Sequence, residues 1–204
     1  MSRRKAPCER RRDLMNAGLR LFTTKGITAT TVDAVTGAAS VAKGTFYQYF
    51  PSKESLLGAL QEQFVNELLE RVNRDLQDIP LDDWPARLAT WVRSGTAHYL
   101  ENHHMHDVLF HHQTIDPTGD DPMAATTRRL AASLAAILSE GRMAGAFHVD
   151  DPPMTAVLLF SALHGVVDQS LHGRGSVDRD RLVRSLQDLA GRAVTEGDSH
   201  EKTS

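Results

Sequence analysis

Cysteine is almost absent from the chain, since Cys8 is the only one in 204 residues. A single thiol excludes an internal disulfide and a metal site built from several cysteine thiolates. Long apolar runs are also missing. The most apolar stretch, residues 154–167, is interrupted by Ser161 and His164, and it is shorter than the roughly 20 residues of a membrane-spanning helix. No apolar segment follows the basic start of the chain, as one would in a secretory signal. We therefore expect a cytoplasmic protein with no membrane segment.

Aromatic residues are sparse at 6%, but hydrophobic residues as a whole make up 41% of the chain. That fraction supports a sizeable core and argues against wholesale disorder. Charge is distributed unevenly, because residues 1–55 carry a net charge of +6 and the remaining residues carry −9. A basic head on an acidic body favours contact between the head and a polyanion such as nucleic acid.

Every strong periodic signal in the sequence is helical, and no segment shows the alternation of a strand. Gly26 follows the first amphipathic segment as a helix stop, Thr31 is an expected N-cap, and Pro51 ends a short helix. Together these signals predict an all-α protein of about nine helices. Their expected ranges are 8–25, 31–38, 42–49, 52–76, 83–103, 105–112, 122–144, 152–171 and 179–194.

Residues 31–50 predict two short helices joined by the tight turn Ala39-Ser40-Val41, with a helix before and a long helix after. This is the helix-turn-helix arrangement, in which the second short helix enters the major groove of DNA. Gly44 would let the backbone approach the groove closely, and Gln48 can pair with an adenine edge. Phe46 and Phe50 are expected to face the core. The alternative is that the aromatic residues are all core and the lysines merely solvated.

The segment "TTVDAVTGAASVAKGTFYQYFPSKESLLGAL" resembles the DNA-binding domain of the TetR family of bacterial transcriptional regulators. The family pattern T-x-x-x-I/V-A-x-x-A-G-V-s-x-G-t-x-Y-x-y-F-x-s-K-e-x-L agrees at nearly every key position over residues 9–60. Ser40 stands where the family has a turn glycine, and Thr36-Gly37 replace a more helix-prone pair. The resemblance implies that eight residues contact DNA: Thr31, Lys43, Gly44, Thr45, Tyr47, Gln48, Tyr49 and Lys53.

The same resemblance implies a division into two domains. A three-helix DNA-binding domain would cover residues 9–69, and a helical ligand-binding and dimerisation domain would cover residues 70–197. Residues 1–8 and 198–204 would be flexible tails. Residues 152–172 are apolar almost all round, so this helix needs partners on every side. With residues 179–194 it is expected to form a homodimer interface, although a fully buried monomer core is the alternative.

Six of the ten histidines lie in the stretch "HYLENHHMHDVLFHHQ". His103, Asp107 and His111 recur every four residues, so they would share one helix face and could bind Zn²⁺. Surface positions, or a polar patch inside a ligand cavity, explain the histidines equally well. A small-molecule pocket is expected among aromatic and polar side chains of the central helices. Its candidates are Trp91, Tyr99, Met105, Phe110, His111, Phe147, Phe160 and His164.

We expect a ligand-responsive transcriptional regulator rather than an enzyme. It would act as a repressor that binds a palindromic double-stranded DNA operator as a homodimer and is released by an unidentified small-molecule effector, with no required cofactor. A metal-dependent enzyme or metal sensor using His103, Asp107 and His111 is the alternative, but no H-E-x-x-H motif accompanies that face. A third hypothesis is a helical interaction protein that has lost DNA binding.

Overall fold

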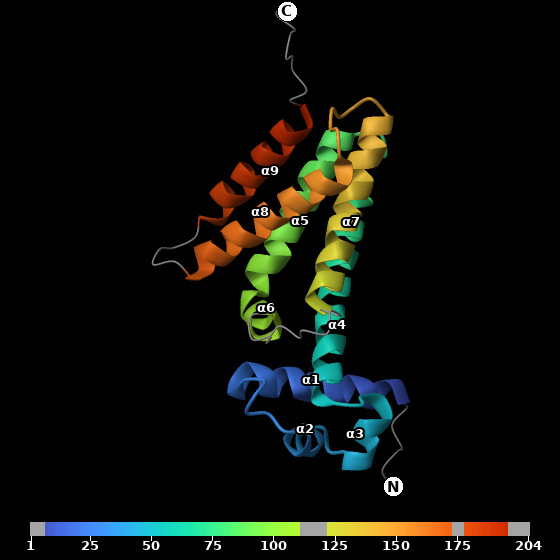
Figure 1. The fold of residues 1–204 in the computed structure, drawn as a ribbon, viewed down its shortest axis with the longest axis vertical. Coiled ribbons are helices and arrows are strands. Elements are labelled where there is room, and N and C mark those ends of the chain that lie inside the picture. Colours follow the sequence, from blue (N-terminus) through green and yellow to red (C-terminus); the bar gives the residue numbers. More distant parts are fainter. Residues whose placement is uncertain (1–6, 111–121, 173–177, 196–204) are drawn as a thin grey trace, which may run out of the picture. The chain divides into compact units, whose positions relative to one another are not determined.

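The computed structural model describes residues 7–110, 122–172 and 178–195 (Figure 1). Within these ranges the chain forms nine α-helices and no strand, which confirms the predicted all-α class. The chain divides into two compact units. Unit 1 comprises residues 1–65 and 103–124, and unit 2 comprises residues 66–102 and 125–204. No helix of the described residues is long and apolar enough to cross a membrane.

Unit 1 contains three helices from the start of the chain, α1 (Pro7–Lys25), α2 (Val32–Ala39) and α3 (Lys43–Tyr49). The first part of α4 (Lys53–Leu76) and the short α6 (His103–Phe110) complete it. Helix α1 begins two residues before the expected domain start at residue 9. The helices meet around a core of side chains with no exposed surface, namely Leu14, Phe22, Val35, Phe46 and Leu56.

Local capping explains where the short helices begin and turn. The Thr31 hydroxyl accepts a hydrogen bond of 3.2 Å from the backbone N–H of Ala34, as the sequence predicts for an N-cap. Ser40 ends α2 with φ 55°, in the left-handed region that usually favours glycine. Its backbone N–H donates to the Gly37 carbonyl at 3.2 Å, and that of Val41 donates to the Thr36 carbonyl at 3.0 Å. These are the bonds of a Schellman-type helix end, which lets the chain turn into α3.

The start of α4 is held by a reciprocal pair of serines. The backbone N–H of Ser55 donates to the Ser52 hydroxyl, and the backbone N–H of Ser52 donates to the Ser55 hydroxyl. Pro51 precedes this pair and stops α3, as expected. Five apolar side chains that recur every three or four residues along α4 are all buried: Leu57, Leu60, Phe64, Leu68 and Val72.

Unit 2 consists of the second part of α4 with α5 (Trp84–Glu101), most of α7 (Pro122–Met143), α8 (Pro152–His172) and α9 (Arg179–Thr195). Helix α5 packs against both α8 and α9 (Figure 1). The Asp83 carboxylate caps α5 through the N–H of Ala86, and the Asp151 carboxylate caps α8 through the N–H of Met154. The predicted starts of both helices are therefore confirmed.

The helix expected over residues 105–112 begins earlier, at His103. Helix α5 ends at Glu101 and is capped by Asn102, whose backbone and side-chain N–H groups both donate to the His98 carbonyl. The side-chain amide competes for a carbonyl at the helix end, and asparagine is favoured in such positions. His103 and Asp107 consequently lie in the same helix, one turn apart, and His111 lies outside the described residues.

Two helical glycines differ in the space around them, which gives a matched pair of substitutions. A methyl group at Gly37 would meet nothing within 4 Å, whereas at Gly18 it would lie 2.7 Å from Leu56 Cδ2. Replacing Gly37 with alanine is expected to raise the free energy of unfolding by about 1 kcal/mol, because alanine loses less backbone entropy in a helix.

Replacing Gly18 with alanine is expected to lower that free energy, since the helix gain is outweighed by overpacking that costs about 1–3 kcal/mol. Urea unfolding followed by circular dichroism measures both changes. A Gly18→Ala variant as stable as Gly37→Ala would contradict this description of the packing between α1 and α4.

Candidate nucleic-acid interface

Helix α3 is fixed to unit 1 by two phenylalanines. Phe46 has no exposed surface and Phe50 is 2% exposed, as expected from the sequence. Their ring centroids lie 5.8 Å apart, and the Tyr47 ring meets Phe46 edge to face at 5.4 Å. The Arg11 guanidinium of α1 stands 5.4 Å over the Phe50 ring, at a distance where a cation and an aromatic face attract. Helix α3 is therefore anchored along one face.

The opposite face of α3 is open to solvent. Tyr47 is 51% exposed, and Lys43, Gly44 and Gln48 are also exposed. A methyl group added at Gly44 would meet nothing within 4 Å, so the backbone here is accessible to a large partner. Thr45 and Tyr49 are half-buried at the edges of this face. The structure thus brings six of the eight predicted DNA-binding residues together on one seven-residue helix.

Thr31 and Lys53 complete the predicted set, but their side chains already have partners in the chain. The Thr31 hydroxyl accepts its bond from Ala34, which leaves its own O–H able to donate to a phosphate oxygen. The Lys53 ammonium donates to the carbonyls of Ile27 and Thr30, at 2.8 Å and 3.1 Å. Lys53 therefore holds the loop between α1 and α2, and one of its three donors remains for a phosphate.

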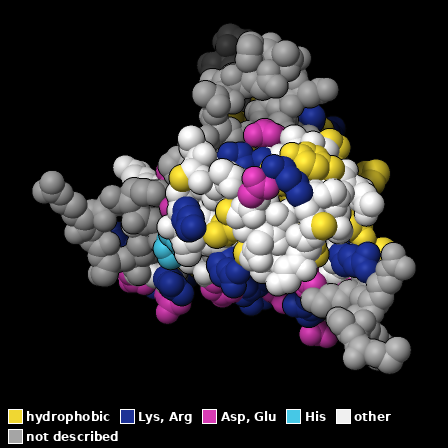
Figure 2. Space-filling model, turned by 90° about the horizontal axis from the view of Figure 1, so that it is seen from below, with side chains coloured by type: hydrophobic (Ala, Val, Ile, Leu, Met, Phe, Trp, Pro, Cys, Tyr) yellow, Lys and Arg dark blue, Asp and Glu magenta, His cyan; other side chains and the backbone are white. Residues whose placement is uncertain are grey.

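Asp33 is a residue of this surface that the sequence reasoning missed. It lies in the first turn of α2, and its carboxylate forms an ion pair with the Lys43 ammonium at 2.8 Å. The hydrogen bond and charge of Asp33 raise the pKa of Lys43 above its ordinary value. Both side chains are more than half exposed. Among the cations of the face that carries α2 and α3, acidic side chains are visible in Figure 2.

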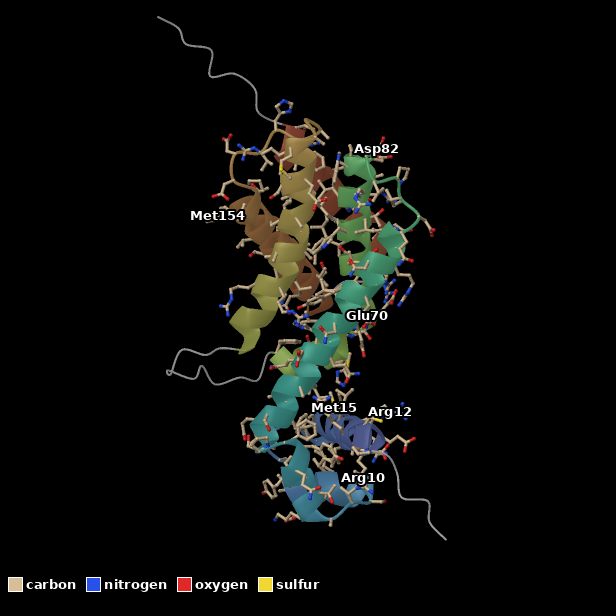
Figure 3. The ribbon with its side chains drawn as sticks, turned by 90° about the vertical axis from the view of Figure 1, so that its right-hand side faces the viewer. Arg10, Arg12, Met15, Glu70, Asp82 and Met154 are labelled. Atoms are coloured by element: carbon tan, nitrogen blue, oxygen red, sulfur yellow. The ribbon has the colours of Figure 1, made fainter. Side chains whose placement is uncertain are left out.

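Helix α1 adds further cations to unit 1. Arg10 and Arg12 lie in its first half (Figure 3), and Arg11 contacts the Phe50 ring from the same turn. Arginine side chains reach phosphate oxygens through several N–H donors at once. The basic head inferred from the sequence is therefore borne mainly by α1, with Lys43 on α3 and Lys53 on α4, whereas residues 1–6 lie outside the described residues.

The predicted pocket residues are placed in both units. In unit 2 the Tyr99 hydroxyl and His164 Nε2 are 2.7 Å apart, and the centroid of the Phe160 ring lies 6.1 Å from that of the His164 ring. In the same unit, Trp91 Nε1 donates a hydrogen bond to the Ser133 hydroxyl. Phe147 is buried in the same unit. Phe110 stacks with His106 in unit 1, and Met105 is half-buried there.

Two clefts lie among the described residues of unit 2, and none of the predicted pocket residues lines either of them. Among the described side chains no group of three metal-ligating residues is close enough to hold an ion. The predicted pocket and the metal face that includes His111 stay predictions.

Comparison with known families assigns both parts of the chain. The family model of tetR-type bacterial regulatory proteins matches residues 14–60, and that of the tetracyclin repressor-like C-terminal domain matches residues 81–194. The second match alone covers more than half of the 204 residues. The chain belongs to the TetR family. The family resemblance noted from the sequence is thereby confirmed.

The curated relatives DhaR and KstR2 of this TetR-family protein are named as transcriptional repressors. It is 34% identical over 68 residues to DhaR of Mycobacterium sp. strain GP1, a match that spans 33% of this chain and 34% of DhaR. It is 29% identical over 101 residues to KstR2 of Mycobacterium tuberculosis, spanning 50% of this chain and 49% of KstR2. The chain thus covers half or less of these relatives. They lend no support to a metal-dependent enzyme.

Solved structures share the fold over nearly the whole chain. A TetR-family regulator from Syntrophomonas wolfei has a TM-score of 0.77 at 19% identity and covers 92% of this chain and 95% of its own. The regulator FadR from Bacillus subtilis, in complex with stearoyl-CoA, has a TM-score of 0.75 at 19% identity and covers 90% and 98%. At such identities the likeness establishes the fold.

Removing the Asp33 charge provides a test of its effect on this surface. Asp33→Asn is expected to tighten binding to a fixed DNA duplex several-fold, because Lys43 is freed and a negative charge near the phosphates is removed. Fluorescence anisotropy at one stated salt concentration measures the change. Glu70→Gln, which removes the same charge from an exposed site of unit 2 (Figure 3), serves as the control. Weaker binding by Asp33→Asn would instead make Asp33 a DNA contact.

Proposed function

We propose that the protein is a ligand-responsive transcriptional repressor that binds a palindromic operator as a homodimer and releases it when a small molecule binds. It acts in the cytoplasm. The observation that carries the proposal is the arrangement of α3. One face of this helix is buried through Phe46, while Lys43, Tyr47 and Gln48 are exposed on the other. A short helix held in this way suits insertion into the major groove.

The exposed residues of α3 take different roles in this proposal. Gln48 and Lys43 can reach base edges, since an amide pairs with adenine and an ammonium with guanine. Tyr47 and Tyr49 supply hydroxyls to phosphate oxygens, and Thr31 does the same from the start of α2. Lys53 acts chiefly by holding the loop that positions Thr31, because two of its donors are bonded to Ile27 and Thr30.

A homodimer is supported by an apolar stripe on unit 2. On α8 four large apolar side chains are markedly exposed, Met154 (55%), Val157 (42%), Leu158 (62%) and Val166 (40%). Figure 3 shows Met154 in the first turn of α8. Leu189 of α9 is 46% exposed. Exposed apolar side chains gathered on neighbouring helices mark an interaction surface. The same stripe of a second copy would cover these side chains in a two-fold symmetric dimer.

The effector is proposed to bind within the helical domain that we assign to residues 70–197, with residues 9–69 forming the DNA-binding domain. Tyr99, Phe160 and His164 offer an apolar surface with two polar tips, as small-molecule sites do. The complex of FadR with stearoyl-CoA supports a site for an organic effector in this fold. Helix α4 belongs to both units. If ligand binding shifts the second half of α4, the fraction of molecules in which α3 is placed to bind DNA would change.

Selection from a random duplex library tests operator binding. The protein is expected to enrich a palindrome whose half-sites lie about one helical turn of DNA, or a multiple of it, apart. Tyr47→Ala is expected to weaken binding to that palindrome about tenfold or more, since both ring and hydroxyl are lost. Tyr47→Phe, which keeps the ring, separates the two contributions. Enrichment of no sequence, or wild-type binding by Tyr47→Ala, would contradict the assignment of α3.

A charge on the apolar stripe tests the homodimer. Leu158→Glu is expected to convert the dimer to a monomer at micromolar concentration, because two carboxylates would be buried at a two-fold interface. Sedimentation equilibrium gives the mass. Leu81→Glu, at a site that is 78% exposed and outside the stripe, should leave the dimer intact. Equal masses for the two variants would place the interface elsewhere.

A further inference from the structure

A cleft of about 330 Å³ lies in unit 2 between α5 and α9, two helices that pack against each other. Three arginines line it, Arg93 from α5 and Arg179 and Arg184 from α9. Such a concentration of cations is unexpected here, because the sequence beyond residue 55 carries a net charge of −9. Three guanidinium groups around one cleft create a local positive potential that favours an anion.

Neither carboxylate of the cleft forms an ion pair with Arg93 or Arg184 among the described residues. Glu101 is engaged by Arg71, with Nη1–Oε2 and Nη2–Oε1 distances of 2.5 Å and 3.2 Å. This bidentate bond is the main reason that the pKa of Glu101 is lowered, and the charge of Arg179 adds to it. Asp180, the second carboxylate, lies in the first turn of α9, where a negative charge is stabilised by the helix itself.

Arg93 and Arg184 are consequently available to a ligand. Both are exposed, and within the part of the chain that the structure describes neither forms an ion pair. A guanidinium presents a planar set of donors that matches a carboxylate, sulfonate or phosphate group. The cleft therefore offers unused donors of the kind that bind an anionic head group.

The floor of the cleft is apolar. Ala97 and Val183 are half-buried and Leu100 is 3% exposed. A purely inorganic anion would leave these side chains uncovered, whereas a molecule with a short apolar body would cover them. The volume lies near the lower end of the roughly 300–1,000 Å³ of small-molecule sites. The arginine side chains and the apolar floor of the cleft together favour binding of a small organic anion.

The walls of the cleft are fixed, and they do not belong to the apolar stripe. The Gln187 amide donates to the Ala89 carbonyl at 2.9 Å, which ties α9 to α5. Arg184 follows Leu182 by two residues, so it lies about 200° around α9 from that side chain. Leu189 of the stripe lies two turns after Leu182 and on the same side of α9, so Arg184 lies on a different side of the helix from the stripe.

From these observations we infer that the cleft between α5 and α9 is a second ligand site, which takes a small amphipathic organic anion through Arg93, Arg179 and Arg184. It is separate from the effector residues Tyr99 and His164, which do not line it. The inference does not depend on DNA binding by α3, and its test needs no operator.

The test titrates the full-length protein with an anionic fluorescent probe, 1-anilinonaphthalene-8-sulfonate, and with its uncharged analogue N-phenyl-1-naphthylamine. The variant Arg93→Gln/Arg184→Gln is expected to bind the sulfonate probe about tenfold or more weakly than the wild type, since two charge-assisted contacts are lost. The control Arg181→Gln/Arg192→Gln removes the same charge from exposed sites of α9 outside the cleft and should bind as the wild type does.

The uncharged analogue separates recognition of the anion from loss of an apolar surface. It is expected to bind both double variants and the wild type equally. Methyl NMR spectra locate the sulfonate probe, which should shift the Val183 methyl signals and not those of Val157 on the stripe. Equal binding of the sulfonate by the two double variants would overturn the inference. So would an equal loss of both probes, or no shift at Val183.

Discussion

Burial of Phe46 is the interaction on which the rest of unit 1 depends. Helix α3 has seven residues, whereas isolated helices shorter than about 12–15 residues are marginal in water. Fully burying one large apolar side chain contributes about 1.5–3 kcal/mol, and Phe46 and Phe50 both supply such burial. The Arg11 guanidinium of α1 stands over the Phe50 ring, and α2 packs against α3, so α1 and α2 must be in place before α3 can present its exposed face.

Features that rest on neighbouring residues could be predicted from the sequence. The Thr31 and Asp83 caps, the Ser40 turn and the stop at Pro51 each depend on groups within about four residues, as local turn chemistry does. The family pattern extends this local information to α3 as a whole. The break at Asn102 was placed a few residues late, because its cause is one side-chain amide bonded to the His98 carbonyl rather than a glycine or proline.

Features that rest on distant residues could not be predicted. The two bonds by which Lys53 holds the loop between α1 and α2 reach carbonyls 23 and 26 residues earlier in the chain. The ion pair between Asp33 and Lys43 joins two helices whose relative turn is set by the conformation of Ser40. The arginine cleft likewise combines α5 and α9, which are far apart in the sequence. Side-chain pairing across elements has no signature in local periodicity.

The pairing of Lys43 with Asp33 has a consequence for the thermodynamics of DNA binding. A lysine that neutralises a phosphate releases a counterion from DNA, and this release makes affinity fall as salt rises. If Lys43 exchanges its carboxylate partner for a phosphate, the freed Asp33 takes up a cation from solution in return. The fall of affinity with rising salt concentration would then be shallower than the number of cations at the interface predicts. A regulator built in this way keeps more of its operator affinity when the ionic strength of its surroundings rises.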